Sequence, residues 1–356
     1  MGKVICFTIS LGSGGAERQL VSLAAMLKES GNDVKFLTYL PDSFYEDKLN
    51  EVGISHICIS HAKSNWTRFW SCKKIIKSFS ADVVIAYLEM PAFMGCLMKW
   101  MGGKFKLIVS ERNTTQKKTR FDKLRFPLMR YADWIVPNSL SQGLFIKKEY
   151  PKFAPKVKVI TNYVDTNSFI PKKKTHDDTT IVLTVARINP QKNILRYIEA
   201  VSKIHGEYDN VVFKWYGAIS DYDYYKRCLE RINDLGIGDV FFFRQPTISI
   251  IDTYQNASIF CLPSLYEGYP NVVCEAMSCG IPIICSNVCD NSTIVENGIN
   301  GVLVNPTSVD SIKQALKDML EMDAITLRNM GYKSREFALK KFSKEQFLAQ
   351  YLSLIN

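Results

Sequence analysis

The stretch Ser264-Leu-Tyr-Glu-Gly-Tyr-Pro-Asn-Val-Val-Cys-Glu-Ala-Met-Ser-Cys-Gly-Ile-Pro-Ile283 decides the fold of this chain. The apolar run 257–262 precedes it and predicts a buried strand. A loop follows, and Pro270 then suits the first turn of a short helix that ends near Gly280, where a second apolar run begins. The sequence therefore predicts a strand, a glycine-bearing loop and a helix N-terminus that meet at one point.

Such a meeting point has a chemical use. The N–H groups of a helix N-terminus attract anions, and Gly268 allows a close approach to the backbone. Glu275, about one turn into the helix, is suited to accept hydrogen bonds from a ribose diol, and Glu267 from sugar hydroxyls. Two glutamates eight positions apart are a weak signal by themselves. A buried strand, loop and helix with a capping glutamate is the alternative interpretation.

The residues around both glutamates are more specific. Pro263-Ser-Leu-Tyr-Glu-Gly-Tyr-Pro270 and Glu275-Ala-Met-Ser-Cys-Gly-Ile-Pro282 resemble the signature of the retaining family 4 glycosyltransferases (glycosyl transferases group 1), which adopt the GT-B fold. The resemblance implies that Glu267 contacts the donor sugar and Glu275 the nucleotide ribose. It also implies donor contacts from the intervening residues Gly268, Tyr269, Pro270, Asn271 and Val272.

Three further segments fit the same family. Arg187 and Lys192 follow an apolar strand and resemble the Arg-x4-Lys pair that grips the donor diphosphate, a clamp that needs no metal. Gly14 and Gly15 lie in a strand–loop–helix segment that resembles the glycine loop facing the diphosphate, although a tight turn alone also explains them. Gln245 follows the strand that in relatives precedes the nucleobase pocket.

The first half of the chain is expected to bind the acceptor. The apolar runs 82–88 and 106–110 predict parallel strands buried on both faces, whose carboxyl ends face a ligand. The family's histidine near this point is missing, so its role falls to Glu111 or Arg112. The predicted catalytic residues are Glu267, Arg187, Lys192 and Glu111, and the predicted acceptor contacts are Arg112, Asn113 and Glu89.

The resemblance implies two Rossmann-like α/β domains with parallel sheets that face across a cleft. We expect an acceptor domain over residues 1–170, a nucleotide-sugar domain over 171–342, and a helix at 343–356 that returns to the first domain. Asp221-Tyr-Asp223 resembles the metal motif of another glycosyltransferase fold, but it is better suited to cap a helix. Neither a metal nor a cofactor is expected.

Composition and charge constrain the location. The chain begins directly with a strand, lacks an apolar run of membrane-spanning length and has ten cysteines, which predicts a cytoplasmic protein in a reducing compartment. Residues 1–165 hold 25 Lys and Arg against 14 Asp and Glu, so the positive excess of the whole chain lies there. This excess suggests an anionic partner.

Two basic segments contain interleaved apolar residues. Segment 66–79 fits an amphipathic helix at a membrane interface, and segment 112–130 fits binding to the anionic inner face of the plasma membrane or to a lipid diphosphate. Helices packed on a sheet with a solvated basic face are the alternative. No nucleic-acid-binding module is visible.

The predicted function is that of a retaining hexosyltransferase. It moves a sugar from a UDP- or GDP-sugar to a glycan, expected to be lipid-linked, in polysaccharide or oligosaccharide biosynthesis. A sugar-nucleotide epimerase of the same fold and a catalytically silent, membrane-associated binding partner are the alternatives. An epimerase needs acid and base groups around the sugar, and a silent partner does not need Arg187 and Lys192.

Overall fold

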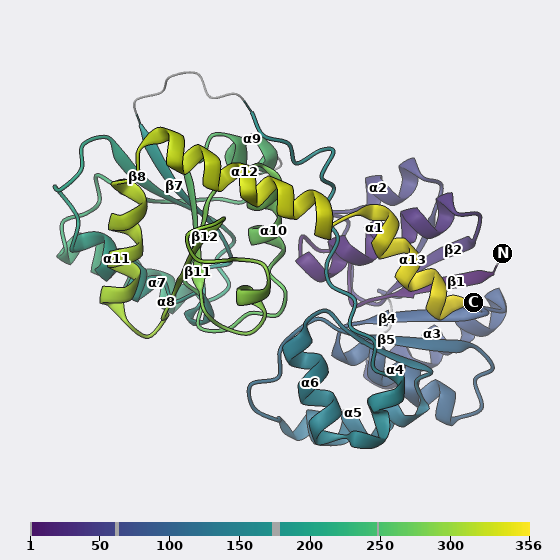
Figure 1. Cartoon of the computed structure of the whole chain (residues 1–356). Coiled ribbons are helices and arrows are strands. Elements are labelled where there is room, and N and C mark those ends of the chain that lie inside the picture. Colours follow the sequence, from purple (N-terminus) through teal and green to yellow (C-terminus); the bar gives the residue numbers. More distant parts are fainter. Residues whose placement is uncertain (1, 61–63, 173–178, 248) are drawn as a thin grey trace. The chain divides into compact units, whose positions relative to one another are not determined.

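The computed structural model describes residues 2–60, 64–172, 179–247 and 249–356. The chain forms two compact units, one made of Met1–Asn162 with Glu345–Asn356 and the other of Tyr163–Lys344. Each unit contains one six-stranded parallel sheet with helices packed on it (Figure 1). Most of the expected linker 171–178 lies outside the described residues.

The first unit has the strand order β3-β2-β1-β4-β5-β6. Its strands are β1 (Lys3–Phe7), β2 (Asp33–Thr38), β3 (Ser55–Cys58), β4 (Val83–Tyr87), β5 (Lys106–Glu111) and β6 (Trp134–Pro137). The α-helices are α1 (Gly15–Glu29), α2 (Glu46–Glu51), α3 (Asn65–Phe79), α4 (Glu89–Trp100), α5 (Arg120–Leu128), α6 (Leu140–Glu149) and α13 (Lys344–Ile355).

The second unit repeats this topology, with the order β12-β11-β10-β7-β8-β9. Its strands are β7 (Thr180–Val185), β8 (Val211–Tyr216), β9 (Phe241–Arg244), β10 (Ile259–Leu262), β11 (Ile283–Ser286) and β12 (Gly301–Val304). The α-helices are α7 (Ile194–Ser202), α8 (Tyr222–Asp234), α9 (Ile250–Gln255), α10 (Asn271–Ser278), α11 (Val309–Leu320) and α12 (Ala324–Lys341).

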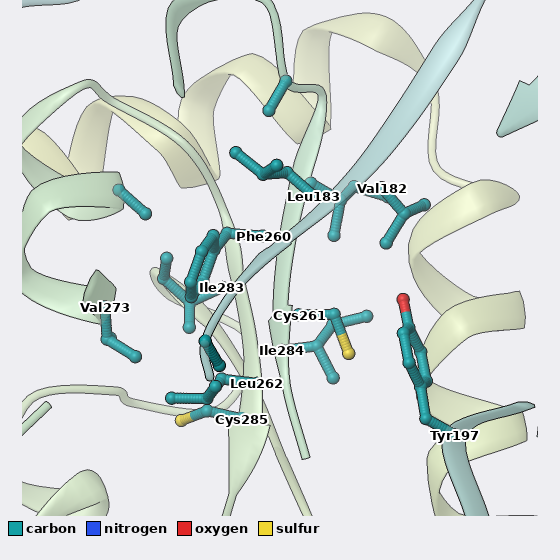
Figure 2. Close-up of a cluster of buried hydrophobic side chains, with 14 of the residues drawn as sticks. Val182, Leu183, Tyr197, Phe260, Cys261, Leu262, Val273, Ile283, Ile284 and Cys285 are labelled. Atoms are coloured by element: carbon teal, nitrogen blue, oxygen red, sulfur yellow. The ribbon is translucent and has the colours of Figure 1, made fainter. Parts of the chain in front are cut away.

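The continuous apolar runs form the central strands because both faces of each sheet are covered. In the second unit, β10 pairs with β11 so that Phe260 lies opposite Ile283 and Cys261 opposite Ile284. Figure 2 shows the first pair on the side of α10 and the second pair on the side of Tyr197 from α7. Burial on two sides explains why these strands lack polar alternation.

Both sheets therefore have the doubly wound order of nucleotide-binding folds, as the sequence predicted. In this order, ligands bind beyond the carboxyl ends of the strands, where the strand order reverses. The reversal falls between β1 and β4 in the first unit, and between β7 and β10 in the second. The loops after these four strands are thus the places to look for a site.

The C-terminal helix α13 completes the core of the first unit. Tyr351 on this helix is fully buried, and its hydroxyl lies 2.7 Å from that of Tyr87 at the end of β4. Lys106 Nζ donates a hydrogen bond of 2.7 Å to the carbonyl of Ile355. Within the described part of the chain, no helix is both long and apolar enough to span a membrane.

Candidate active site

The loops after β7 and β10 are held together at the reversal point of the second sheet. The Leu265 N–H donates to the Gln191 carbonyl at 2.9 Å, and Gln191 Nε2 donates to the Tyr266 carbonyl at 2.9 Å. Because neighbouring strands deliver these loops, their side chains share one edge of the sheet. This edge carries most of the residues that the sequence predicted for the donor.

The side chain of Asn193 also connects these loops. It adopts the left-handed conformation, with φ 60° and ψ 35°, directly before α7. Its buried side-chain amide donates to the carbonyl of Pro263 at 2.9 Å and to that of Pro306 at 2.7 Å. Asparagine suits this position because it tolerates the left-handed region and carries two donors. One side chain thus ties together the loops after β7, β10 and β12.

We expect an Asn193→Ala variant to lose about 3 kcal/mol in its free energy of unfolding, from two lost hydrogen bonds and the cost of a left-handed alanine. An Asn193→Gly variant keeps the backbone conformation and should lose less. Urea denaturation measures both values. Asn210→Ala is the matched control, because Asn210 has φ 58° but is exposed. An Asn193→Ala loss no larger than that of the control would contradict the locking role.

Lys192 and Glu267 form the charged centre of this edge. Lys192 Nζ lies 2.5 Å from Glu267 Oε1, and only 12% and 9% of the two side chains are exposed. Each side chain therefore fixes the position of the other in a partly dehydrated setting. Arg187 lies exposed two residues after the end of β7. The structure brings Lys192 and Glu267 together, a pairing that the sequence analysis had not foreseen.

Helix α10 begins four residues after Glu267 in the chain. Its N-cap is Pro270, so the helix begins one residue later than predicted, and no side chain caps it. The positive end of the helix dipole lies at Asn271 and Val272, which are half-buried. Gly268 is also half-buried, whereas Tyr269 is buried against Phe342, with 6.4 Å between ring centroids.

Glu275 lies one turn further along α10 and is buried. The Tyr254 hydroxyl of α9 donates to Glu275 Oε2 at 2.9 Å. Tyr254 was not among the predicted site residues, because nothing in the sequence links α9 to α10. Gln245 lies exposed after β9, the edge strand, two strands away from β7. It shares the carboxyl edge of the sheet but not the reversal point.

In the first unit, Glu111 at the end of β5 belongs to a buried ion cluster. Arg125 of α5 donates to Glu111 Oε1 at 2.6 Å and to Asp122 Oδ1 at 2.7 Å. Burial raises the pKa of Glu111, and the charge of Arg125 offsets this rise only in part. Burial also acts to raise the pKa of Asp122, but hydrogen bonds from Thr119 and Arg125 hold it below its ordinary value.

This cluster corrects the interpretation of the basic segment 112–130 at Arg125, whereas Lys117, Arg120 and Lys123 are exposed. Both interpretations of that segment placed its cations in solvent or on a membrane. Arg125, however, is only 3% exposed and pairs with carboxylates inside the unit. Its pairing with a strand-end glutamate depends on tertiary packing, for which the spacing of charges gives no signal. The exposed side chain of Glu89, at the start of α4, is close enough to affect the charge of Glu111.

The side chain of Arg112 is also buried and makes its contacts within the first unit. Its guanidinium stacks on the ring of Tyr87 at 4.6 Å and donates to Ser110 and Asn162. Asn113, the next residue, is exposed. Of the residues predicted to meet the acceptor, Asn113 and Glu89 therefore present their side chains to solvent.

The residue before Glu89 has an unusual backbone. Leu88 has φ 73° and ψ 166°, a region that is almost restricted to glycine. This strain lies at the reversal point of the first sheet. Backbone strain of this kind is concentrated at ligand sites, which supports a role for the adjoining Glu89.

The glycine loop after β1 has a local explanation. Gly14 is the N-cap of α1, and a Cβ atom there would lie 2.1 Å from the carboxylate of Glu17. The carboxylate of Glu17 thus folds back over the start of α1. Glycine at position 14 leaves room for this carboxylate, and Gly15 is the first residue of α1. Both glycines lie at the reversal point of the first sheet.

Other predictions concern capping and metals. Asp221 is the N-cap of α8, and its side chain accepts a hydrogen bond of 2.9 Å from the Tyr224 N–H, as predicted. Across the residues that the structure describes, no three His, Cys, Asp or Glu side chains are grouped to hold a metal ion.

Comparison with known proteins agrees with this architecture. Residues 165–337 match the family of glycosyl transferases group 1, and residues 13–168 match glycosyltransferase family 4. The structure of Anabaena HepE in complex with UDP-glucose superposes with a TM-score of 0.87 at 17% identity, covering 99% of both chains.

Among the proteins that are similar in sequence are two enzymes whose names state their reactions. A Campylobacter jejuni enzyme, named GalNAc-alpha-(1->4)-GalNAc-alpha-(1->3)-diNAcBac-PP-undecaprenol alpha-1,4-N-acetyl-D-galactosaminyltransferase, is 25% identical over all of this chain and 98% of its own. An Escherichia coli enzyme, named UDP-Gal:alpha-D-GlcNAc-diphosphoundecaprenol alpha-1,3-galactosyltransferase, is 29% identical over 45% of this chain and 44% of its own.

The two doubly wound units define a protein of the GT-B class. Within that class, the chain belongs to the family 4 glycosyltransferases of group 1 and is a glycosyltransferase. The predicted fold and family are confirmed.

Proposed function

We propose that this chain transfers a sugar from a nucleotide diphosphate sugar to a lipid-linked glycan, with retention of configuration, during cell-surface polysaccharide biosynthesis. The observation that carries the proposal is the Lys192–Glu267 ion pair, only slightly exposed, at the reversal point of the second sheet. Glu267 precedes the start of α10 by four residues. The names of the similar enzymes support a UDP-sugar donor and an acceptor on a polyprenol diphosphate.

The diphosphate leaving group sets the main requirement of the reaction. Negative charge grows on it as the bond to the sugar breaks, so preorganised positive charge lowers the barrier. Lys192, Arg187 and the N-terminal end of α10 are the groups that we assign to this task. These groups stabilise the departing diphosphate without a metal ion in the proposed reaction. The leaving phosphate oxygen then takes the proton of the attacking acceptor hydroxyl on the same face of the sugar.

Glu267 has a positioning task in this scheme. Its Oε1 is held by Lys192, so its carboxylate is fixed beside the diphosphate site and can accept hydrogen bonds from donor-sugar hydroxyls. The chain continues from Glu267 to the start of α10 through five residues that we assign to donor contacts: Gly268, Tyr269, Pro270, Asn271 and Val272. In the first unit, the exposed Glu89 and Asn113 are assigned to the acceptor. We assign a supporting role to Glu111 and Arg112, which are buried next to Asn113 in the chain.

We expect a Glu275→Ala variant to bind the UDP-sugar roughly 10- to 100-fold more weakly, because a charged acceptor for the ribose hydroxyls is lost. Calorimetric titration with the donor measures the change. Tyr254→Phe is the control: it removes the hydroxyl that binds Glu275 but keeps the carboxylate, so donor affinity should change little. Unchanged affinity in Glu275→Ala would refute the ribose role.

One assay tests the function and separates the alternatives. The protein is incubated with UDP- and GDP-sugars, with and without an undecaprenyl-diphosphate-linked saccharide, and nucleotide diphosphate release and product are followed. A transferase gives acceptor-dependent release and a new α-linkage from an α-donor. An epimerase interconverts the sugar nucleotide without acceptor, and a silent binding partner does neither. Either of the last two outcomes would overturn the proposal.

A further inference from the structure

Helix α12 runs along the second unit (Figure 1) and presents large apolar side chains to solvent. Ile325, Tyr332 and Leu339 are 71%, 67% and 50% exposed. Successive members are seven residues apart, which is close to two helical turns, so all three lie on one face of the helix. We call these residues the α12 stripe. Exposed apolar groups that share one face indicate an interaction surface, whereas scattered ones are ordinary.

The opposite face of α12 fixes the helix to the second unit. It is formed by four buried residues: Met330, Gly331, Ser334 and Ala338. Gly331 packs so closely that a Cβ atom on it would collide with the carbonyl oxygen of Gly280. The Ser334 hydroxyl donates to the Asn300 carbonyl at 3.0 Å, and Arg335 donates to three further carbonyl groups. The stripe is therefore preformed, and binding does not have to order it.

The stripe and its charged neighbours are symmetric about Tyr332. Ile325 lies seven residues before Tyr332, and Leu339 lies seven residues after it. Arg328 lies four residues before Tyr332, and Glu336 lies four residues after it. Both charged side chains are exposed. Two antiparallel copies of α12, related by a two-fold axis at Tyr332, therefore place Ile325 level with Leu339 and Arg328 level with Glu336 of the second copy.

The ends of α12 favour the same direction. Asp323 is the N-cap, and Lys340 and Lys341 lie in the last turn, and all three are exposed. Antiparallel pairing brings the two lysines of each copy level with Asp323 of the other, and it also opposes the two helix dipoles. Parallel pairing would place like charges together at both ends. Charge complementarity thus selects a second copy of this chain, in one direction, as the partner of the stripe.

We propose that two copies of this chain associate through the α12 stripe, in an antiparallel contact centred on Tyr332. Ile325 of each copy packs on Leu339 of the other, and Arg328 of each copy pairs with Glu336 of the other. A single pair of helices makes a small interface, so the dimer is weak, with a Kd on the order of 10–100 μM. This association does not depend on the proposed function.

The first test is sedimentation velocity of the full chain from about 2 to about 200 μM, a range that spans this Kd. We expect a reversible rise from the mass of one chain toward that of two. In Tyr332→Glu/Leu339→Glu, the Kd should increase at least about 10-fold, because four charges enter an apolar contact. Both side chains are exposed, and circular dichroism and the melting temperature verify that the variant is folded.

Exchange of charges tests the direction of the contact. Glu336→Arg places arginine level with Arg328 of the second copy, so its Kd should increase about 10-fold. Arg328→Glu/Glu336→Arg restores opposite charges across the interface and should associate like the wild type. Both variants lose the exposed pair between Lys333 and Glu336, at 2.9 Å within one chain, so only the contact between copies distinguishes them.

A disulfide tests the position of the two-fold axis. Cys58 and Cys289, the two partly exposed cysteines, are first replaced by serine. With Tyr332→Cys in this background, the new thiols of two copies meet at the axis, and mild oxidation should yield a covalent dimer. Tyr222→Cys is the matched control, because Tyr222 is 62% exposed on α8 of the same unit but lies outside the stripe. It should yield little covalent dimer.

Three outcomes would overturn the proposal. They are a chain that stays monomeric at about 200 μM, association that is unchanged in Tyr332→Glu/Leu339→Glu, and equal covalent dimer from Tyr332→Cys and Tyr222→Cys. Because α12 packs on α10 through its buried face, the stripe lies away from Glu275, and Tyr332→Glu/Leu339→Glu should keep the wild-type turnover per chain. Sedimentation needs no sugar nucleotide. A chain that dimerises but transfers no sugar would therefore refute only the proposed function.

Discussion

A Lys192→Ala variant is expected to lose at least about 100-fold in kcat, the size of effect that follows removal of one preorganised charge from a transition state. Lys192 is assigned to the departing diphosphate and is already oriented by Glu267 at 2.5 Å. Steady-state rates of nucleotide diphosphate release, at saturating donor and acceptor, measure the effect. Arg187→Ala should show a loss of the same order, because it removes the second cation.

Two companion variants make this result interpretable. Lys203→Ala removes an exposed lysine that pairs with Asp310 at 2.9 Å in the same unit, and its turnover should equal that of the wild type. Lys192→Ala/Glu267→Gln removes the carboxylate charge that the single variant leaves unpaired. If the double variant melts like the wild type but is still slow, the defect is catalytic. Near-normal kcat in Lys192→Ala would remove the central assumption of the proposed function.

An Arg125→Met variant is expected to lose about 3–5 kcal/mol in its free energy of unfolding, because it leaves the carboxylates of Glu111 and Asp122 without their buried cation. Urea denaturation, monitored by circular dichroism, measures the loss. As a control, Glu149→Gln breaks the more exposed ion pair with Lys118 and should leave stability nearly unchanged.

The stability loss of Arg125→Met is also expected to depend on pH, in a direction set by Glu111. Without Arg125, the pKa of Glu111 in the folded state should rise further above its unfolded value. The folded variant then holds a proton that the unfolded chain releases, so its stability falls as the pH rises. The difference from the wild type should be smaller near about pH 5 than near about pH 8. Arg125→Met/Glu111→Gln should recover part of the loss, and a loss independent of pH would contradict the ionic explanation.

The fold followed from the sequence because its signals are local. Apolar runs such as Val83–Tyr87 mark strands buried on both faces, and residues such as Gly280 mark the ends of helices. Repetition of strand, loop and helix then leaves few topologies for a parallel sheet. The family motifs add the same conclusion independently. Boundaries were less accurate, and Pro270 proved to be the N-cap instead of the first helical residue.

Pairings between distant residues could not be predicted in the same way. Lys192 in the loop after β7 and Glu267 in the loop after β10 were identified separately, but their contact depends on β7 and β10 being neighbours in the sheet. Asn193 was missed because its role depends on a left-handed backbone and on carbonyl groups 70 and 113 residues away. Arg125 was missed because a charge pattern does not reveal which cation turns inward.

Helix α13 also determines the order in which the protein can be completed. The ribosome delivers Tyr351 and its neighbours only after the entire second unit has been synthesised, yet they fill the core beside Tyr87. During translation the first unit therefore emerges with this part of its core uncovered. Its final closure is a late step, and it depends on how quickly the intervening polypeptide is made.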